Sequence, residues 1–261
     1  MGLFDNTAKR LATGPTLLLQ TDPAEAMADA LLAYDPGVRT PRGRFVFGNG
    51  VVLCGPVEIN ADLAMKAALP AGMTAGYYAE IIKSGAGGEA HGRRPDPAKW
   101  QDAERLVRGL AARLGGIVHD ERPRMEIHLG CSVYAAEPVP AEEVIGTLQP
   151  YTDDTLFVDK QEDVAGAYLL VSEQEPRFIT SYYPPLLSRS KVQPPPLALG
   201  PMRKQEPCRW ELSTWYPVET ASREIRLTVG TAALALARRT DGAVVDAFGF
   251  PVGRPEDLLP R

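Results

Sequence analysis

The chain carries one pattern twice, as Leu110-Ala111-Ala112-Arg113-Leu114-Gly115-Gly116-Ile117-Val118-His119-Asp120 and again as Leu236-Ala237-Arg238-Arg239-Thr240-Asp241-Gly242-Ala243-Val244-Val245-Asp246. Each copy has the pattern of a helix end, a glycine stop, a short apolar strand and a closing aspartate. The copies lie almost half the chain length apart. Repetition at a fixed period is the signature of a duplicated unit, so we expect two related units of roughly 120 residues.

The first half of the chain predicts the order β-α-β-β-α-β. A helix is expected to begin at Asp22-Pro23-Ala24-Glu25, because Asp22 can cap it, Pro23 suits its first position and Glu25 completes a capping box. Gly48-Asn49-Gly50, between two apolar runs, is a hairpin signal. Strands are expected at 16–21, at 44–47 with 51–54, at 75–83 and at 116–119, and a long helix at 97–114.

The second half repeats this order. Residues 125–134 alternate as a strand, and Pro140-Ala141-Glu142 opens a helix as Pro23-Ala24-Glu25 does. The later strands are expected at 156–158 with 167–171, at 209–216 and at 243–246, and the long helix at 222–239.

This order is that of the ferredoxin-like arrangement, in which two helices cover one face of a four-stranded antiparallel sheet. We predict an α+β protein of two tandem ferredoxin-like (βαββαβ) units packed as one pseudo-two-fold body. The alternative is that the repeated pattern arises by chance within a single irregular α+β domain. The expected boundaries are an N-terminal tail at 1–13, units at 14–121 and 122–253, a Pro-rich insertion at 176–207 and a C-terminal tail at 254–261.

Charge and cysteine content restrict the expected environment of the chain. The net charge of −5 does not favour nucleic acid or anionic lipid as a partner. Cys54, Cys131 and Cys208 are isolated, which indicates a reducing compartment rather than a disulfide framework. The sequence has no apolar run of about 18 residues and no signal-peptide pattern, so we expect a cytoplasmic protein that does not contact a membrane.

A glycine-rich segment in the first half, residues 84–94, is a candidate anion site. Glycines before a helix can expose backbone N–H groups to a phosphate, and two neighbouring arginines can clamp it. The candidate residues are Gly87, Gly88, His91, Arg93 and Arg94. The segment matches neither a P-loop nor a dinucleotide fingerprint, so a plain flexible loop is the alternative.

The Pro-rich insertion is the candidate partner-binding arm. Its proline runs predict extended, stiff backbone, and its basic residues, on an acidic protein, indicate an acidic partner. Aromatic and arginine side chains are the types that anchor protein interfaces. The candidate residues, which lie in or just after the insertion, are Tyr182, Tyr183, Arg189, Lys191, Arg203, Lys204, Trp210 and Trp215. The alternative is a solvated loop whose aromatic residues lie partly in the core.

No established catalytic or metal-binding spacing occurs in the chain. The histidines are His91, His119 and His128, with no zinc-site pattern and no nucleophile elbow, and the acidic stretch at 153–163 does not form a calcium loop. His119 could work with His128 in acid–base chemistry if their strands pair. Asp246 repeats Asp120 although Val245 replaces His119, so a structural role is expected for the shared aspartate.

We therefore expect a non-enzymatic protein-binding module of the immunity-protein, chaperone or adaptor type, without cofactor or metal. Its partner would be another protein with an acidic surface, with RNA possible but not favoured. The alternative is an RNA-processing or phosphate-handling enzyme that uses the loop at 84–94, or His119 with His128.

Overall fold

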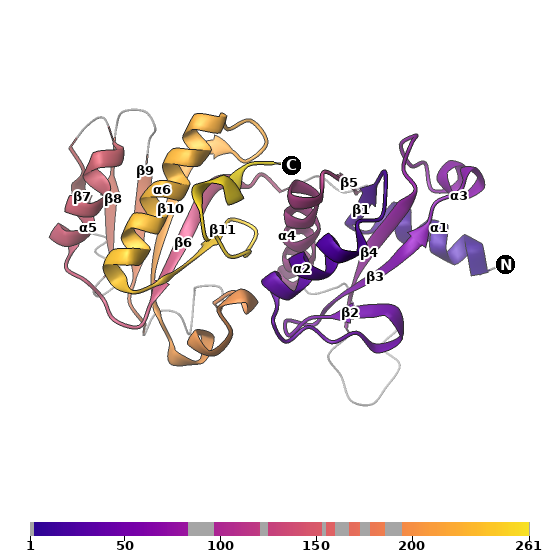
Figure 1. The fold of residues 1–261 in the computed structure, drawn as a ribbon, viewed down its shortest axis with the longest axis horizontal. Helices are drawn as coiled ribbons and strands as arrows, with labels where there is room; N and C mark the ends of the chain where they lie inside the picture. The colour runs from indigo at the N-terminus through magenta and orange to yellow at the C-terminus, as the bar shows by residue number, and fades with distance from the viewer. Residues whose placement is uncertain are drawn as a thin grey trace. The chain divides into compact units, whose positions relative to one another are not determined.

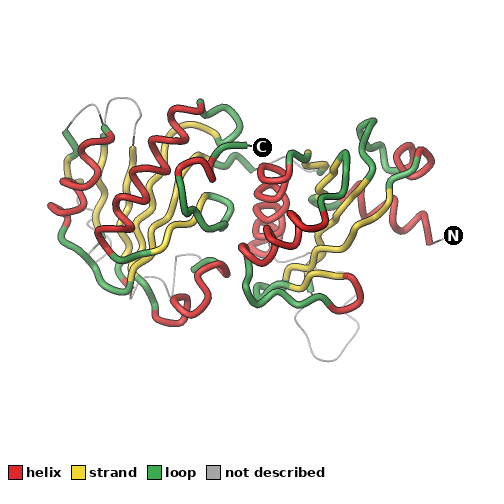
Figure 2. The backbone as a smooth tube through the Cα atoms, viewed as in Figure 1, coloured by secondary structure: helices red, strands yellow, loops and turns green. Residues whose placement is uncertain are grey.

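The computed structural model describes residues 3–82, 97–120, 125–152, 155–159, 167–172, 178–185 and 195–260. The chain divides into two compact units, Met1–Met125 (unit 1) and Glu126–Pro260 (unit 2), each with its own antiparallel sheet (Figures 1 and 2). The division falls a few residues after the boundary expected from the sequence.

Unit 1 has a five-stranded sheet in the order β2-β3-β4-β1-β5, in which all neighbours are antiparallel. Helix α4 packs against β1, β4 and β5, and α1 packs against α3 and β4. Gly76 in β4 leaves room for Leu11 of α1, whose side chain lies 3.1 Å from the place a β-carbon would take. The elements are α1 Leu3–Thr13, β1 Thr16–Leu19, α2 Ala24–Tyr34, η1 Pro41–Gly43, β2 Arg44–Val46, β3 Val51–Glu58, α3 Ala61–Lys66, β4 Ala75–Ile81, α4 Pro97–Leu114 and β5 Ile117–His119.

Unit 2 has a six-stranded antiparallel sheet in the order β11-β6-β10-β9-β8-β7. Helix α6 packs on β6 and against α5, and Trp210, Val133 and Leu212 are fully buried in the core. The elements are β6 His128–Ala135, α5 Ala141–Leu148, η2 Gln149–Tyr151, β7 Phe157–Asp159, β8 Tyr168–Val171, β9 Phe178–Tyr183, η4 Leu197–Gln205, β10 Cys208–Pro217, α6 Arg223–Thr240, β11 Ala243–Asp246 and η5 Pro255–Leu258.

The mixed α+β class is confirmed, but the two-unit βαββαβ arrangement is not. The sheets contain five and six strands instead of four, and strand β9 lies inside the expected Pro-rich insertion. The expected N-terminal tail forms helix α1, in which Ala8 and Leu11 are buried. The expected C-terminal tail contains η5.

The hairpin expected around Gly48-Asn49-Gly50 is present as β2 and β3, with Gly50 at a φ of 85°. Only such a left-handed backbone closes this tight turn, and glycine adopts it without strain. Among the helices that the structure describes, none is both long and apolar enough to cross a membrane.

Candidate functional site

Strand β10 presents two chemically different faces. Cys208, Trp210, Leu212 and Thr214 alternate along it and are buried. The residues between them, Arg209, Glu211, Ser213 and Trp215, become more accessible along the strand: the exposed fraction is 14% for the Arg209 side chain, 40% for that of Glu211 and 60% for Trp215. The strand period of two therefore separates a core face from an accessible face.

The core face holds a stacked group of aromatic rings. Tyr168 stacks on Tyr182 with ring centroids 4.8 Å apart, and Tyr182 lies 5.1 Å from Trp210. The Trp210 indole Nε1 donates a hydrogen bond to the Tyr168 hydroxyl at 3.0 Å. Tyr182 and Trp210, which the sequence offered as partner-binding residues, are 6% and 0% exposed. Their side chains belong to the core, because Tyr182 on β9 and Trp210 on β10 are register partners on the covered side of the sheet, and neither belongs to the candidate surface.

The accessible face begins at an arginine held between two tyrosines. The Arg209 guanidinium lies 5.4 Å from the Tyr183 ring centroid and 6.0 Å from that of Tyr134, within the range of cation–π attraction. It also pairs with Glu211 at 2.6 Å. Because Tyr183 and Tyr134 are the register partners of Arg209 on β9 and β6, the sheet itself fixes this arrangement. Tyr183 is thus a predicted residue that lies on the accessible side, as Trp215 does.

Helix η4 covers one end of this face. Its Leu199 packs with Tyr134 and Val245, and its Met202 lies against the same cluster. The predicted basic residues Arg203 and Lys204 occupy its last turn, where Arg203 is half-buried and Lys204 is exposed. Only a short turn follows before β10 begins, so these two charges lie near the Arg209 end of the strand.

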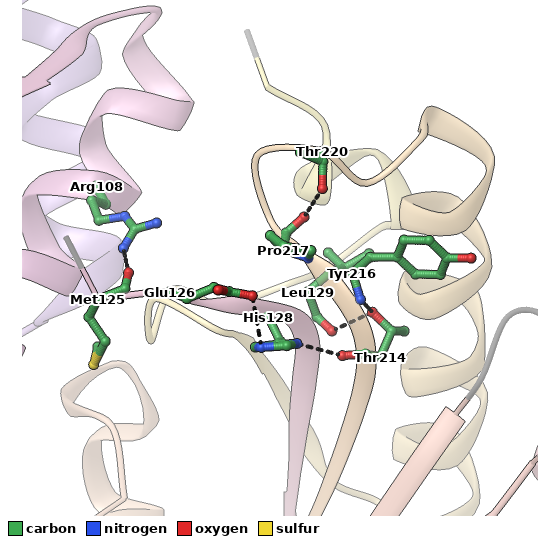
Figure 3. Close-up of polar contacts among 9 residues, drawn as sticks. All are labelled: Arg108, Met125, Glu126, His128, Leu129, Thr214, Tyr216, Pro217 and Thr220. Carbon is green, nitrogen blue, oxygen red and sulfur yellow. Dashed lines mark hydrogen bonds and ion pairs between the residues drawn. The ribbon is translucent and has the colours of Figure 1, made fainter.

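The other end of β10 carries Trp215 close to a histidine–glutamate pair. His128 Nε2 lies 3.3 Å from a Glu126 carboxylate oxygen, and His128 Nδ1 lies 3.2 Å from the carbonyl oxygen of Thr214 (Figure 3). The Thr214 hydroxyl donates to the Leu129 carbonyl and accepts from the Tyr216 amide (Figure 3). These contacts fix the backbone on both sides of Trp215, at the register shift between Ser213 and Pro217 in the pairing of β10 with β6.

Several predicted residues lie outside the part of the chain that the structure describes. They are Arg189 and Lys191 of the arm, and Gly87, Gly88, His91, Arg93 and Arg94 of the candidate anion loop. The roles assigned to them stay predictions.

The two histidines of the alternative catalytic site belong to different sheets. His119 ends β5, which pairs with β1, and His128 begins β6, which pairs with β10 and β11. The strand pairing on which a joint role depended does not occur among the described strands. Within the described ranges, no group of three or more His, Cys, Asp or Glu side chains could hold a metal ion.

Asp246 has the backbone role that the repeat suggested. It is buried, and its Oδ1 accepts hydrogen bonds from the amides of Phe248 and Phe250, both at 2.9 Å. The carboxylate thereby holds the tight turn that follows β11.

Sequence reasoning missed Arg209 and Glu211 as members of the accessible face, and it missed Tyr134 as the buried ring beside Arg209. A signal was present, because residues 208–213 alternate between apolar and polar side chains, and the same period of two continued to 215 puts Trp215 on the polar face. That alternation separates Trp210 from Trp215, but it does not reveal which residue of β6 lies opposite Arg209.

Comparison of the chain with family models, with curated proteins and with solved structures finds no match.

Proposed function

We propose that the chain is a non-enzymatic protein-binding module whose contact surface is the accessible face of β10 in unit 2. The observation that carries this proposal is Trp215, which is 60% exposed on a strand whose backbone is fixed on both sides. A large aromatic side chain on rigid backbone loses little conformational entropy on binding, and tryptophan is enriched among the residues that dominate interface energies.

The dimensions and charge of this face suit a protein partner. Arg209 and Trp215 are separated by about 20 Å of strand at roughly 3.3 Å per residue, which fits within one side of a standard interface of about 800 Å². Arg203 and Lys204 at the η4 end favour an acidic partner surface and would raise the association rate. The Arg209–Glu211 pair and Ser213 offer hydrogen-bonding groups to the partner.

Co-purification from the native host, followed by mass spectrometry, tests this proposal. Trp215→Ala should weaken capture of the partner by about 2 kcal/mol, or roughly 30-fold. Arg203→Glu with Lys204→Glu should lower the association rate. Leu32→Ala in unit 1 is the matched control, because Leu32 is 52% exposed but lies on a different unit. A partner captured equally by all three variants would refute the assignment of this surface.

We also propose that the two units derive from one duplicated ferredoxin-like core. Four strands follow the same order in each unit, β5-β1-β4-β3 in unit 1 and β11-β6-β10-β9 in unit 2, and a long helix precedes the last strand of each. On this proposal β2, and β7 with β8, are later additions at the sheet edge. An experimental structure in which these two sets of four strands do not superpose would contradict it.

A further inference from the structure

Unit 1 carries an exposed loop whose only charged residues are arginines. We name residues 37–48 the arginine loop; it contains Arg39, Arg42 and Arg44 and no aspartate or glutamate. All three arginines are exposed. The whole chain, these three arginines included, has a net charge of −5, so the loop is a local inversion of charge on an acidic protein.

The arginine loop is held in shape at its base by one buried carboxylate. Asp35 is 5% exposed, and its two carboxylate oxygens accept from the amides of Gly37 at 2.8 Å and Gly48 at 2.9 Å. These amides are at the two ends of the loop. Arg39 and Val46 then exchange two backbone hydrogen bonds, at 3.1 and 2.8 Å. The loop is therefore preformed, which lowers the ordering cost of binding a ligand.

The tip of the loop has a backbone that a non-glycine residue rarely adopts. Arg42 has φ 52° and ψ 41°, and Gly43 follows with φ 71°. A left-handed backbone conformation raises the energy of any residue that has a β-carbon. Such conformations cluster at functional positions. Pro41 before it has a restricted φ, so the backbone places Arg42 at the apex of the loop, between Arg39 and Arg44 in sequence.

The three guanidinium groups are not neutralised by the rest of the described chain. No carboxylate of the described residues forms an ion pair with Arg39, Arg42 or Arg44, whereas Arg10 pairs with Glu80 at 2.8 Å. The Cys54 thiol, opposite Arg44 in the sheet register, lies 3.6 Å from that same Glu80. Glu80 is thus already engaged by Arg10 and the Cys54 thiol, and the Asp35 carboxylate is engaged by the amides of Gly37 and Gly48.

We propose that the arginine loop binds an acidic peptide segment of a partner protein in extended conformation. Arg39 pairs with Val46 across the loop, and Arg44 lies two residues before Val46 on the same side of the loop as Val46. Arg39 and Arg44 are therefore diagonal neighbours, about 7–8 Å apart. Alternate side chains of an extended peptide point the same way at a similar spacing, about 6.6–6.8 Å. Carboxylates at positions i and i+2 therefore match Arg39 and Arg44, and Arg42 at the apex can take a third. Each guanidinium can hold a carboxylate by two parallel hydrogen bonds.

Nucleic acid fits these observations less well than a peptide. Phosphate-backbone binding uses about 6–10 basic contacts along a stripe, and the loop supplies a compact group of three on an acidic chain. The described loop also lacks an exposed aromatic ring on which a base could stack, since its Phe45 is half-buried and Phe47 is buried. The inference does not depend on the surface proposed in unit 2.

Fluorescence anisotropy with the full chain tests this inference. The probe is a labelled peptide of about ten residues in which glutamate alternates with threonine, and the competitors are a duplex DNA of about 12 base pairs and a single-stranded RNA of about ten nucleotides. At about 0.1 M salt, charges more than about 10 Å from the peptide are screened. Arg39→Glu with Arg42→Glu and Arg44→Glu should weaken peptide binding at least about tenfold.

The matched control reverses Lys9, Arg223 and Arg238, which are exposed and lie outside the loop. It changes the net charge by the same amount and should alter peptide affinity less than about twofold. Equal losses in both triple variants would overturn the inference in favour of bulk charge. Tighter binding of the DNA or RNA than of the peptide would overturn the assigned ligand class, and a wild-type chain that does not bind the peptide would refute the site itself.

Discussion

Replacing Arg226 with methionine should release the C-terminal segment of unit 2 and destabilise the unit as a whole. Arg226 is 7% exposed on α6, and its guanidinium donates to three backbone carbonyls: those of Ala221 at 3.1 Å, of Leu258 at 3.0 Å and of Val218. Burial lowers the pKa of the Arg226 guanidinium, and the charge of Glu219 partly opposes this shift. One side chain therefore joins the start of α6 to η5, which is far along the sequence.

The expected loss follows from the three hydrogen bonds. A hydrogen bond from a charged donor contributes roughly 1.5–3 kcal/mol, and a buried carbonyl left without a donor costs about 1–3 kcal/mol. Removing the arginine also removes the cost of burying a charge, which offsets part of the loss. We expect about 3–5 kcal/mol in the free energy of unfolding of unit 2, a large part of the 5–15 kcal/mol typical of a domain.

Urea unfolding followed by tryptophan fluorescence measures this loss. In a Trp100→Phe background the remaining tryptophans, Trp210 and Trp215, both report on unit 2. Arg223→Met is the matched control, because Arg223 is exposed on the same helix and should change stability by less than about 0.5 kcal/mol. A loss below about 1 kcal/mol for Arg226→Met would show that water satisfies the three carbonyls, and the reasoning would be refuted.

Three further predictions concern buried polar groups. Glu104→Ala should cost unit 1 about 3 kcal/mol, because it leaves the Arg108 guanidinium buried without its carboxylate; thermal unfolding unchanged from wild type would contradict this. Burial raises the pKa of the Cys54 thiol to about 11 and of the Tyr168 hydroxyl to about 12. Since both groups ionise at lower pH when unfolded, stability should fall as pH rises from about 9 to 12, and Cys54→Ala with Tyr168→Phe should flatten the fall in Tm. An identical slope in that double variant would rule this out. Asp35→Ala should speed hydrogen exchange in the arginine loop while the sheet amides stay protected; equal protection in the variant and wild type would argue against the carboxylate clamp.

The elements with strong local signals were predictable from the sequence. Ser222 was expected to begin the last long helix, and its side chain accepts from the Ile225 amide at 3.2 Å as the N-cap of α6. The Gly48-Asn49-Gly50 hairpin formed for the same reason, because capping and tight turns depend on a few neighbouring residues. Helix α1 was missed, since its buried face is stabilised by packing on α3 and β4 rather than by a local start signal.

The candidate surface was predictable only in part, because it depends on pairing between distant strands. Composition identified the Pro-rich insertion, which contains Tyr183, and the residues just after it, which include Trp215. The period of two within β10 then separates exposed Trp215 from buried Trp210. The position of Arg209 between Tyr183 and Tyr134 comes from the register of three strands, which no local pattern specifies. The same limit applies to Asp35, whose partner Gly48 lies across the loop.

The burial of all three thiols has a practical consequence. Cys54, Cys131 and Cys208 are the only cysteines of the chain, and each is buried. Thiol reagents attack the accessible thiolate, so the native cysteines should stay unmodified while the protein is folded. A single cysteine introduced at an exposed position, such as Arg42→Cys or Lys204→Cys, would then take a maleimide dye selectively. The wild-type background thus allows site-specific labelling of either unit without first removing a native residue.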